Sequence, residues 1–293
     1  MASKFFLVAI GSILAQNAVV QAASIDYLFT FGDSYTQTSF DINGEKPSAS
    51  NPIGNPAFPG ITTAGGPNWV GNMVTEQNSS LVLAYNFAYG GATVDSKIVK
   101  PWSDTVKSLV DQVDQFSNSV GKHPVSWNAE NTIAGVWIGI NDVGGTFYLQ
   151  DAASIIEKAT TRYFEMLEIL YQAGLRKFVL LRVPPTELTP TMIQQGPDSN
   201  AMLVKAINHF NSQVASKLES FRWSHSGVKT HLVNTSVAFK EAINNPQKYG
   251  APNATCVGDN GCLWHDPYHP GTAIHEITAA QVARELKYNW FGW

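Results

Sequence analysis

Four short segments, far apart in the sequence, carry residue types that together could perform acyl transfer. The first is "FTFGDSY", where an apolar run ends in Gly32-Asp33-Ser34. The others are "NFAYGGATVD" (residues 86–95), "GIND" (residues 139–142) and "WHDPYHPG" (residues 264–271). Together they offer a hydroxyl, a turn of adjacent glycines, a carboxamide, and a histidine that follows an acid on the same turn.

The serine, the histidine and the acid have the types that nucleophilic catalysis requires. A serine hydroxyl is a weak nucleophile until a base removes its proton, and that base is often an imidazole held by a carboxylate. Ser34 would be the nucleophile, His269 the base and Asp266 the orienting carboxylate. Pro270 biases the backbone of His269 toward an extended conformation. The sequence therefore predicts a triad of these three residues, with the neighbouring His265 outside it.

The glycine turn and the asparagine could stabilise the reaction's transition state. The negative oxygen of a tetrahedral intermediate needs a few fixed hydrogen-bond donors. A glycine N–H has no side chain in the way, and Asn141 offers a neutral amide. The N–H of Ser34 is a third candidate. Taken alone, Ser34 is also typical of a helix cap and Asn141 of a plain turn, so the combination carries the argument.

In this order the segments resemble the four blocks of the GDSL/SGNH hydrolase family, which is named for Ser, Gly, Asn and His. Ser34 stands in "FGDSY", Asn141 in "GIND", and Asp266 with His269 in "DPYHP". The blocks span most of the chain. The resemblance implies a serine esterase that needs no cofactor.

The resemblance also decides between the two glycines. Counting from Asn86 places the family's oxyanion glycine at Gly91, with Gly90 as the near alternative. The implied oxyanion hole therefore consists of Ser34, Gly91 and Asn141. The sequence departs from the family name at Tyr35, which stands in place of leucine. We expect that position to lie outside the chemistry.

Further features resemble secreted fungal acetylesterases of the carbohydrate-esterase type. These are the Pro/Gly-rich segment that ends in "GGPNWV" and the block "NFAYGGAT". The resemblance implies a small-molecule or oligosaccharide ester as substrate, with acetyl esters on plant-wall oligosaccharides such as acetyl-xylo-oligosaccharides. Two alternatives stay open: a GDSL lipase or phospholipase that acts on longer acyl esters, and a non-catalytic carbohydrate-binding protein.

The long loop after the nucleophile favours the short-acyl alternative. Residues 39–66 are mostly polar, whereas a lipase needs an apolar groove and flap. Hydroxyl-rich leaving groups need hydrogen-bond partners when they lose water. Trp69 or Trp264 could offer a sugar ring a flat face, or could belong to the core.

Alternating strands and helices must position these residues. Apolar runs predict strands at residues 25–31, 81–87, 132–140, 177–183 and 229–233, and helical spacing predicts helices at 106–120, 155–170, 203–221 and from Pro270 to about Lys287. This alternation predicts one α/β domain over residues 24–293, a three-layer α/β/α arrangement with a parallel sheet. The family resemblance makes that an SGNH-hydrolase, flavodoxin-like fold. Ligands of such sheets bind beyond the carboxyl ends of the strands, where the four segments lie.

The N-terminus and the bulk composition indicate an extracellular protein. Residues 1–23 have one early lysine, an apolar run over residues 5–15 and small residues at the end, a pattern typical of a secretory signal peptide. That run is shorter than the roughly 20 residues that span a bilayer, so we expect no stable membrane anchor. The net charge is −4 and no Lys/Arg cluster occurs, so we expect no nucleic-acid partner.

Possible modifications agree with that location. Asparagines at positions 78, 234 and 253 begin N-x-S/T sequons. The two cysteines, Cys256 and Cys262, are expected to form one small-loop disulfide, with a pair of free thiols as the alternative. His265, Asp266 and His269 could also be metal ligands, but no further cluster completes such a site, so we expect no metal.

Overall fold

A parallel sheet of five strands lies at the centre of the molecule, in the order β2–β1–β3–β4–β5. The strands are β1 (Ile25–Gly32), β2 (Leu81–Asn86), β3 (Thr132–Trp137), β4 (Lys177–Leu181) and β5 (Lys229–Val233). The computed structural model describes residues 25–258 and 261–288, so the expected signal peptide at residues 1–23 lies outside it. Within those ranges no helix is long and apolar enough to cross a membrane.

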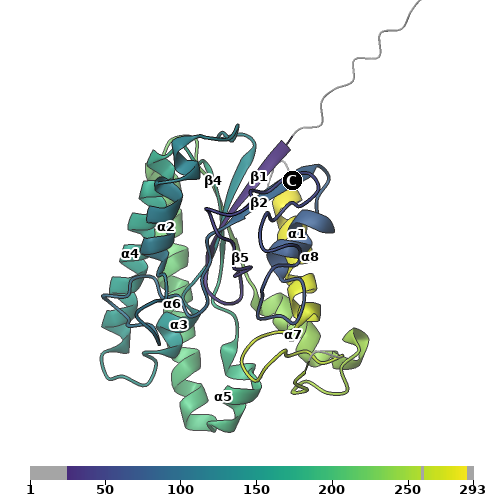
Figure 1. Ribbon diagram of the computed structural model, residues 1–293. Helices are drawn as coiled ribbons and strands as arrows, with labels where there is room; N and C mark the ends of the chain where they lie inside the picture. Colours follow the sequence, from purple (N-terminus) through teal and green to yellow (C-terminus); the bar gives the residue numbers. More distant parts are fainter. Residues whose placement is uncertain (1–24, 259–260, 289–293) are drawn as a thin grey trace, which may run out of the picture.

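Helices cover both faces of the sheet (Figure 1). One face carries α2 (Leu109–Ser117), α4 (Ala152–Gln172) and α6 (Pro197–Ser224), and the other carries α1 (Trp69–Thr75), α7 (Ser236–Asn244) and α8 (Thr272–Tyr288). Short helices α3 (Ile140–Gly144) and α5 (Pro190–Gln194), and 3₁₀ turns at Val120–Lys122, Thr186–Leu188 and Pro246–Tyr249, complete the described elements. Because both faces are covered, β3 and β4 are buried along their whole length and have apolar sequences. The predicted three-layer fold is confirmed.

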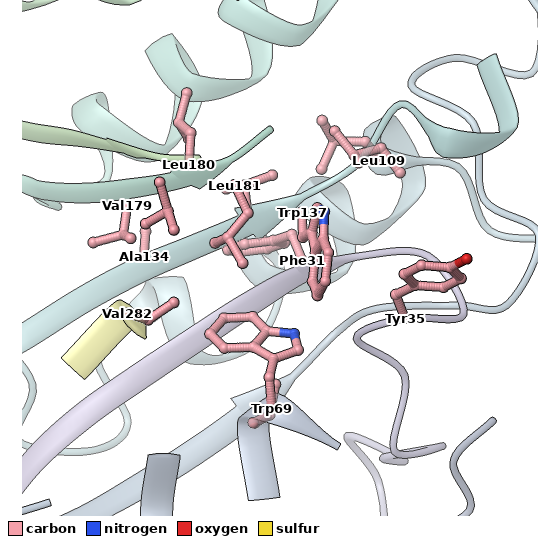
Figure 2. Close-up of a cluster of buried hydrophobic side chains, with 14 of the residues drawn as sticks. Phe31, Tyr35, Trp69, Leu109, Ala134, Trp137, Val179, Leu180, Leu181 and Val282 are labelled. Atoms are coloured by element: carbon pink, nitrogen blue, oxygen red, sulfur yellow. The ribbon is translucent and has the colours of Figure 1, made fainter. Parts of the chain in front are cut away.

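Aromatic side chains fill much of the core on both faces of β1. Phe31 stacks on Phe87 with ring centroids 5.3 Å apart, and Trp69 meets Trp137 edge to face at 6.3 Å. Figure 2 shows Phe31, Trp69 and Trp137 together, with Tyr35 at one end of the cluster. Trp69 is 1% exposed and Trp264 is fully buried, so both are core residues and neither can stack on a sugar.

The strand order reverses beside β1, and this reversal creates the position for a site. The chain runs from β1 to β2 on one side and then returns to β3 on the other side of β1. At such a switch point the connecting helices diverge to opposite faces and leave a crevice beyond the strand ends. Ser34 follows β1 and Asn141 follows β3, so both reach this crevice.

Some expected boundaries were wrong, for local reasons. The strand expected at residues 132–140 ends at Trp137, because Gly139 has a φ of +111° and α3 starts at Ile140. The last helix begins at Thr272 rather than at Pro270. Helices α1, α3, α5 and α7, each at most nine residues long, were not expected. Helix α2 is no longer than α7, but apolar residues at helical spacing continue beyond both of its ends, from Val106 to Val120.

Gly32 allows β1 and β3 to approach each other where the nucleophile turn begins. A Cβ atom on this glycine would lie 2.3 Å from the carbonyl oxygen of Trp137, and its φ is +156°. We expect Gly32→Ala to lower the free energy of unfolding by more than the roughly 1–3 kcal/mol typical of a strained backbone alone. Urea unfolding of both variants measures this, with Gly196→Ala as the control, because Gly196 has a φ of +87° but open space around it. Equal losses in the two variants would contradict the close-approach argument.

Candidate active site

The turn that carries Ser34 is fixed by an amide from α2. The side chain of Gln112 accepts the N–H of Gly32 at 2.9 Å and donates to its carbonyl at 2.8 Å. The carbonyl of Asp33 then accepts the N–H groups of Thr36 and Gln37 at 3.0 and 2.9 Å. The strand end therefore closes into a tight turn that leaves Ser34 8% exposed at its apex.

Two buried asparagines fasten this turn to neighbouring elements. Asn68 caps the N-terminus of α1, and its Nδ2 donates to the carbonyls of Thr36 and Gln37, both at 2.9 Å. Asn86, at the end of β2, donates to the Thr36 carbonyl at 2.6 Å. The nucleophile turn is thus held from β2, α1 and α2 together.

Ser34, His269 and Asp266 form one continuous chain of hydrogen bonds. Nε2 of His269 lies 2.9 Å from Oγ of Ser34, and Nδ1 lies 2.7 Å from Oδ2 of Asp266. Oδ1 of Asp266 accepts the backbone N–H groups of Tyr268 and His269, both at 2.8 Å. The three side chains are within the reach that proton transfer needs. The structure brings together the three residues that the sequence selected.

Asp266 is held in its ionised form by these contacts. Partial burial alone would raise the pKa of its carboxyl, but the two backbone donors and the adjacent imidazole bring that pKa below its ordinary value. An ionised carboxylate keeps the Nδ1 proton of His269 in place and leaves Nε2 free to accept a proton from Ser34. His265 contributes a backbone bond instead, because its N–H donates to the carbonyl of His269 at 2.9 Å.

The loop before Asp266 is anchored by a buried tryptophan and a disulfide. Nε1 of Trp264 donates to the carbonyl of Ala254 at 2.8 Å, and the backbone N–H of Trp264 donates to that of Cys256 at 3.3 Å. Cys256 and Cys262 are bonded as a disulfide, with Cα atoms 5.0 Å apart. Both anchors lie within a few residues of the acid, so they limit how far the Asp266–His269 turn can move.

Ser34, Gly91 and Asn141 keep hydrogen-bond donors available. Asn141 Nδ2 uses one of its two hydrogens on a backbone carbonyl of the glycine loop at 2.9 Å. In the described part of the chain, the N–H groups of Ser34 and Gly91 have no acceptor, whereas the N–H of Gly90 is donated to the side-chain oxygen of Gln37. This difference favours Gly91 over Gly90 as an oxyanion donor.

A cavity of about 610 Å³ opens over the hydroxyl of Ser34. Apart from the groups above, its walls include Ser39, Phe40, Thr63, Tyr89, Trp102, Lys107 and Gln115. The loop expected to border the site does so, through the first three of these. Trp102 was missed in the sequence: it is 80% exposed, and the sequence alone does not separate a surface tryptophan from the buried ones. The lining combines hydroxyls, amides and aromatic faces.

Tyr35 lies beside the imidazole of His269. Its side chain is fully buried, and its hydroxyl donates to the carbonyl of Tyr268 at 2.6 Å. Its ring meets the ring of His269 edge to face at 5.7 Å and stacks on Phe239 at 6.4 Å from the other side. Tyr35 does not touch the reacting atoms, but it supports the turn that presents the base.

Two buried acids lie beneath the site. Burial raises the pKa of Asp33 to about 8, and the charge of Asp142 adds to this effect against the single N–H that Tyr35 donates. Burial likewise raises the pKa of Asp142 to about 7, although the N–H of Val94 bonds to both of its oxygens. Oδ2 of Asp33 has no hydrogen-bond partner among the described residues.

The remaining candidate residues lie outside the cavity. Asn234 and Asn253 are exposed, and Asn78 is half-buried between α1 and β2. His275 is buried, and its Nδ1 accepts the N–H of Trp69 at 3.3 Å. The described ranges hold no group of three or more His, Cys, Asp or Glu side chains that could bind a metal.

Comparisons with known proteins show which proteins the chain is similar to. The family model for GDSL-like Lipase/Acylhydrolase matches residues 28–282. An acetylesterase of Thermothelomyces thermophilus is 48% identical over 92% of this chain and 90% of its own, and an acetylesterase of Hypocrea jecorina is 26% identical over 89% of this chain and 87% of its own. The fold is similar to that of Axe2, an acetylxylan esterase from Geobacillus stearothermophilus, with a TM-score of 0.52 and 16% identity over 90% of this chain and 95% of that one.

Tyr35→Phe should show whether the Tyr35 hydroxyl acts by positioning His269 or by stabilising the whole fold. The variant keeps the ring beside His269 and loses the hydroxyl that holds Tyr268. A misplacement of about 1 Å can cost roughly 10²-fold in rate, so we expect kcat for p-nitrophenyl acetate to fall about tenfold with KM nearly unchanged. Steady-state kinetics measures this beside the melting temperature. A wild-type kcat would refute the positioning role.

Asp33→Asn should weaken the pH dependence of stability. A carboxyl whose pKa is raised on folding binds more protons in the folded state, so stability is greatest below its unfolded pKa and falls as the pH rises toward about 8. We expect the wild-type melting temperature to fall between pH 5 and pH 9, and the variant, which keeps an acceptor for Tyr35, to fall less. Thermal unfolding across this range tests the point, and identical slopes would contradict it.

Proposed function

Because the chain belongs to the GDSL-like lipase/acylhydrolase family and is a carboxylic ester hydrolase, we propose that it is a secreted serine esterase that removes acetyl groups from acetylated plant-wall oligosaccharides, such as acetyl-xylo-oligosaccharides. One observation carries this proposal: the hydrogen-bond chain from Asp266 through His269 to Ser34 opens into a cavity with polar and aromatic walls. An acetylesterase that is 48% identical over 92% of this chain supports the acetyl group.

In the first step, Oγ of Ser34 attacks the ester carbonyl while Nε2 of His269 takes its proton. The 2.9 Å separation already aligns donor and acceptor for this transfer. The imidazole becomes positively charged, and the carboxylate of Asp266, 2.7 Å from Nδ1, stabilises that charge. Nε2 then returns the proton to the leaving sugar oxygen as the C–O bond breaks.

The oxygen of the tetrahedral intermediate accepts from Ser34 N, Gly91 N and Asn141 Nδ2. These neutral donors are fixed before substrate arrives, so they stabilise the developing charge without a cost of reorganisation. The acetyl-enzyme on Ser34 is then cleaved by water, with His269 again acting as base. Every group in this cycle belongs to the protein or the substrate, and the proposal includes no cofactor.

The cavity wall supports a sugar as the leaving group. Trp102 offers an exposed aromatic face beside the glycine turn, and a sugar ring can stack on such a face. Ser39, Thr63 and Gln115 supply hydroxyl and amide groups that can bond to sugar hydroxyls when they lose water. The hydroxyls of Ser39 and Thr63 donate to backbone carbonyls, so they keep acceptor capacity for sugar hydroxyls, and a lipid-like alcohol would offer these groups fewer partners.

A second candidate substrate class rests on an adjoining cavity. This space of about 430 Å³ lies beside Gly91 and Asn141, and its walls include Phe147, Met192 and Leu203. An apolar space of this kind could accept a longer acyl chain, since each buried methylene contributes about 0.8 kcal/mol. The adjoining cavity therefore keeps the lipase-type alternative open, and experiment must distinguish long-chain esters from acetyl esters as substrates.

The extracellular location rests on the leader-like sequence at residues 1–23 and on the expected sequons. Removal of that segment from the mature protein is part of the proposal. Sequencing the N-terminus of protein recovered from the culture medium of the native host tests it, and an intact Met1 would contradict it.

A panel of esters tests the proposed substrate. We expect p-nitrophenyl acetate to be the best aryl ester, with activity falling sharply beyond about four acyl carbons on steric grounds. Trp102→Ala should raise KM for acetylated xylo-oligosaccharides and leave kcat/KM for p-nitrophenyl acetate nearly unchanged. Ser34→Ala is the inactive control. Specificity that climbs to about eight carbons or more would favour the lipase alternative.

Asn141→Ala should act on the transition state alone. Loss of one oxyanion donor typically lowers kcat by about 10²–10³-fold, and we expect that loss with little change in KM for p-nitrophenyl acetate. Initial-rate kinetics separates the two constants. If KM rises strongly while kcat holds, Asn141 binds substrate in the ground state instead.

A further inference from the structure

A second polar cavity lies beyond the carboxyl ends of β4 and β5 and shares no lining residue with the catalytic one. Its volume is about 480 Å³, within the range of roughly 300–1,000 Å³ typical of small-ligand sites. Helices α6 and α7 and the turn after β4 form its walls, which include Arg182, Glu187, Asn208, Asn234 and Lys240. The proposed esterase mechanism uses none of these residues.

Two charged side chains in this cavity have buried atoms without partners. Nε of Arg182 and Oε2 of Glu187 make no hydrogen bond within the described residues. The backbone of Arg182 is held in place, since its N–H donates to Val233 at 3.1 Å and its carbonyl accepts from Thr235 Oγ1 at 2.9 Å. Burial raises the pKa of Glu187. An unpaired donor and an unpaired acceptor each cost stability, and both side chains line the cavity, so the cavity favours a ligand that both accepts and donates.

Asn234 lies on the rim of this cavity and begins the sequon Asn234-Thr235-Ser236. Its residue is exposed, and its backbone carbonyl is fixed by Nε2 of Gln281 at 3.0 Å. Its carboxamide makes no hydrogen bond in the described part of the chain. The side chain is therefore available for modification at a point from which an attached group reaches the cavity.

We propose that Asn234 carries an N-linked glycan and that this cavity seats its first sugar residue. The hydroxyl and acetamido oxygens of N-acetylglucosamine accept from the guanidinium group of Arg182, and a sugar hydroxyl donates to the carboxylate of Glu187, since both side chains line the cavity. The apolar ring face packs on Val204 and Ile207, which also line the cavity. The carbohydrate thus gives the two charged groups hydrogen-bond partners and covers the exposed part of Val204.

The modification itself belongs to the secretory pathway, so this inference rests on the secreted location proposed above. Nδ2 of Asn234 loses a proton to a base and forms a bond to the anomeric carbon of a polyprenyl-pyrophosphate-linked oligosaccharide, whose pyrophosphate leaves. The inference does not depend on the proposed ester substrate.

Glycan mapping tests the inference directly. The full chain is secreted from a eukaryotic host under a heterologous leader, so that its entry into the pathway does not depend on residues 1–23. Mass spectrometry of the peptides should find Asn234 occupied. A peptide:N-glycanase, which cleaves the bond between Asn234 and the first sugar, should release this glycan at least about tenfold more slowly from the folded protein than from the denatured one, because release requires that sugar to leave its seat. An unoccupied Asn234, or equal rates of release, would overturn the proposal.

Two kinds of variant distinguish the binding of the sugar in the cavity from its attachment to Asn234. Glu187→Gln keeps the shape of the side chain and removes its charge, and it should speed release from folded protein at Asn234. Asn234→Gln should lower the melting temperature by about 2–4 °C, whereas Asn253→Gln, at an exposed sequon that does not line this cavity, should not. Release unaffected by Glu187→Gln, or equal melting temperatures for the two asparagine variants, would also refute the seat. Asn234→Gln should keep its rate on p-nitrophenyl acetate, so failure here is distinct from failure of the proposed function.

Discussion

The hydrogen bond between His269 and Ser34 is the contact on which the rest of the site depends, because its partners are 235 residues apart in the sequence. Each side must be fixed independently to within a few tenths of an ångström. On the serine side, Gln112, Asn68 and Asn86 hold the turn through its own backbone groups. On the histidine side, Trp264 anchors the loop, and Tyr35 lies between the two sides. These buried hydrogen bonds therefore all help to fix the distance between Oγ of Ser34 and Nε2 of His269.

The carboxylates show how the fold assigns roles to one residue type. Asp266 is partly exposed and receives two backbone donors and an imidazole, so its pKa is lowered and it can stabilise a positive charge. Asp33 is buried with a single donor, and burial raises its pKa to about 8. An ionised Asp33 would carry a poorly compensated charge in the core. Its chemistry suits it to hold the turn that bears Ser34 rather than to act on substrate.

Much of the fold could be predicted because it follows from local pattern. Apolar runs bounded by glycine and proline predict β1 and β4 well, and period alone predicts α4 and α6. The three residues that the structure brings together could be selected because serine, histidine and aspartate occur in ordered blocks with distinctive neighbours. The end of β3 could not be predicted from the sequence, because it depends on the φ of a single residue, Gly139.

The parts of the site that sequence could not show depend on tertiary contacts. Tyr35 supports the imidazole only because residue 268 lies over it in the folded chain. The family resemblance selects Gly91 over Gly90, but the sequence does not show that the side chain of Gln37 binds the N–H of Gly90 and leaves that of Gly91 free of it. Trp102 differs from the core tryptophans only in its exposure. No spacing in the sequence encodes any of these three relations.

Active-site labelling with a fluorophosphonate, followed by peptide mapping, tests the central claim most directly. The reagent forms a stable adduct with a serine only where a base activates the hydroxyl and donors receive the phosphoryl oxygen. The account predicts one adduct, on the peptide that contains Ser34, which is lost in His269→Ala and forms at the wild-type rate in His265→Ala. An adduct on another serine, or labelling that needs His265 and not His269, would contradict it.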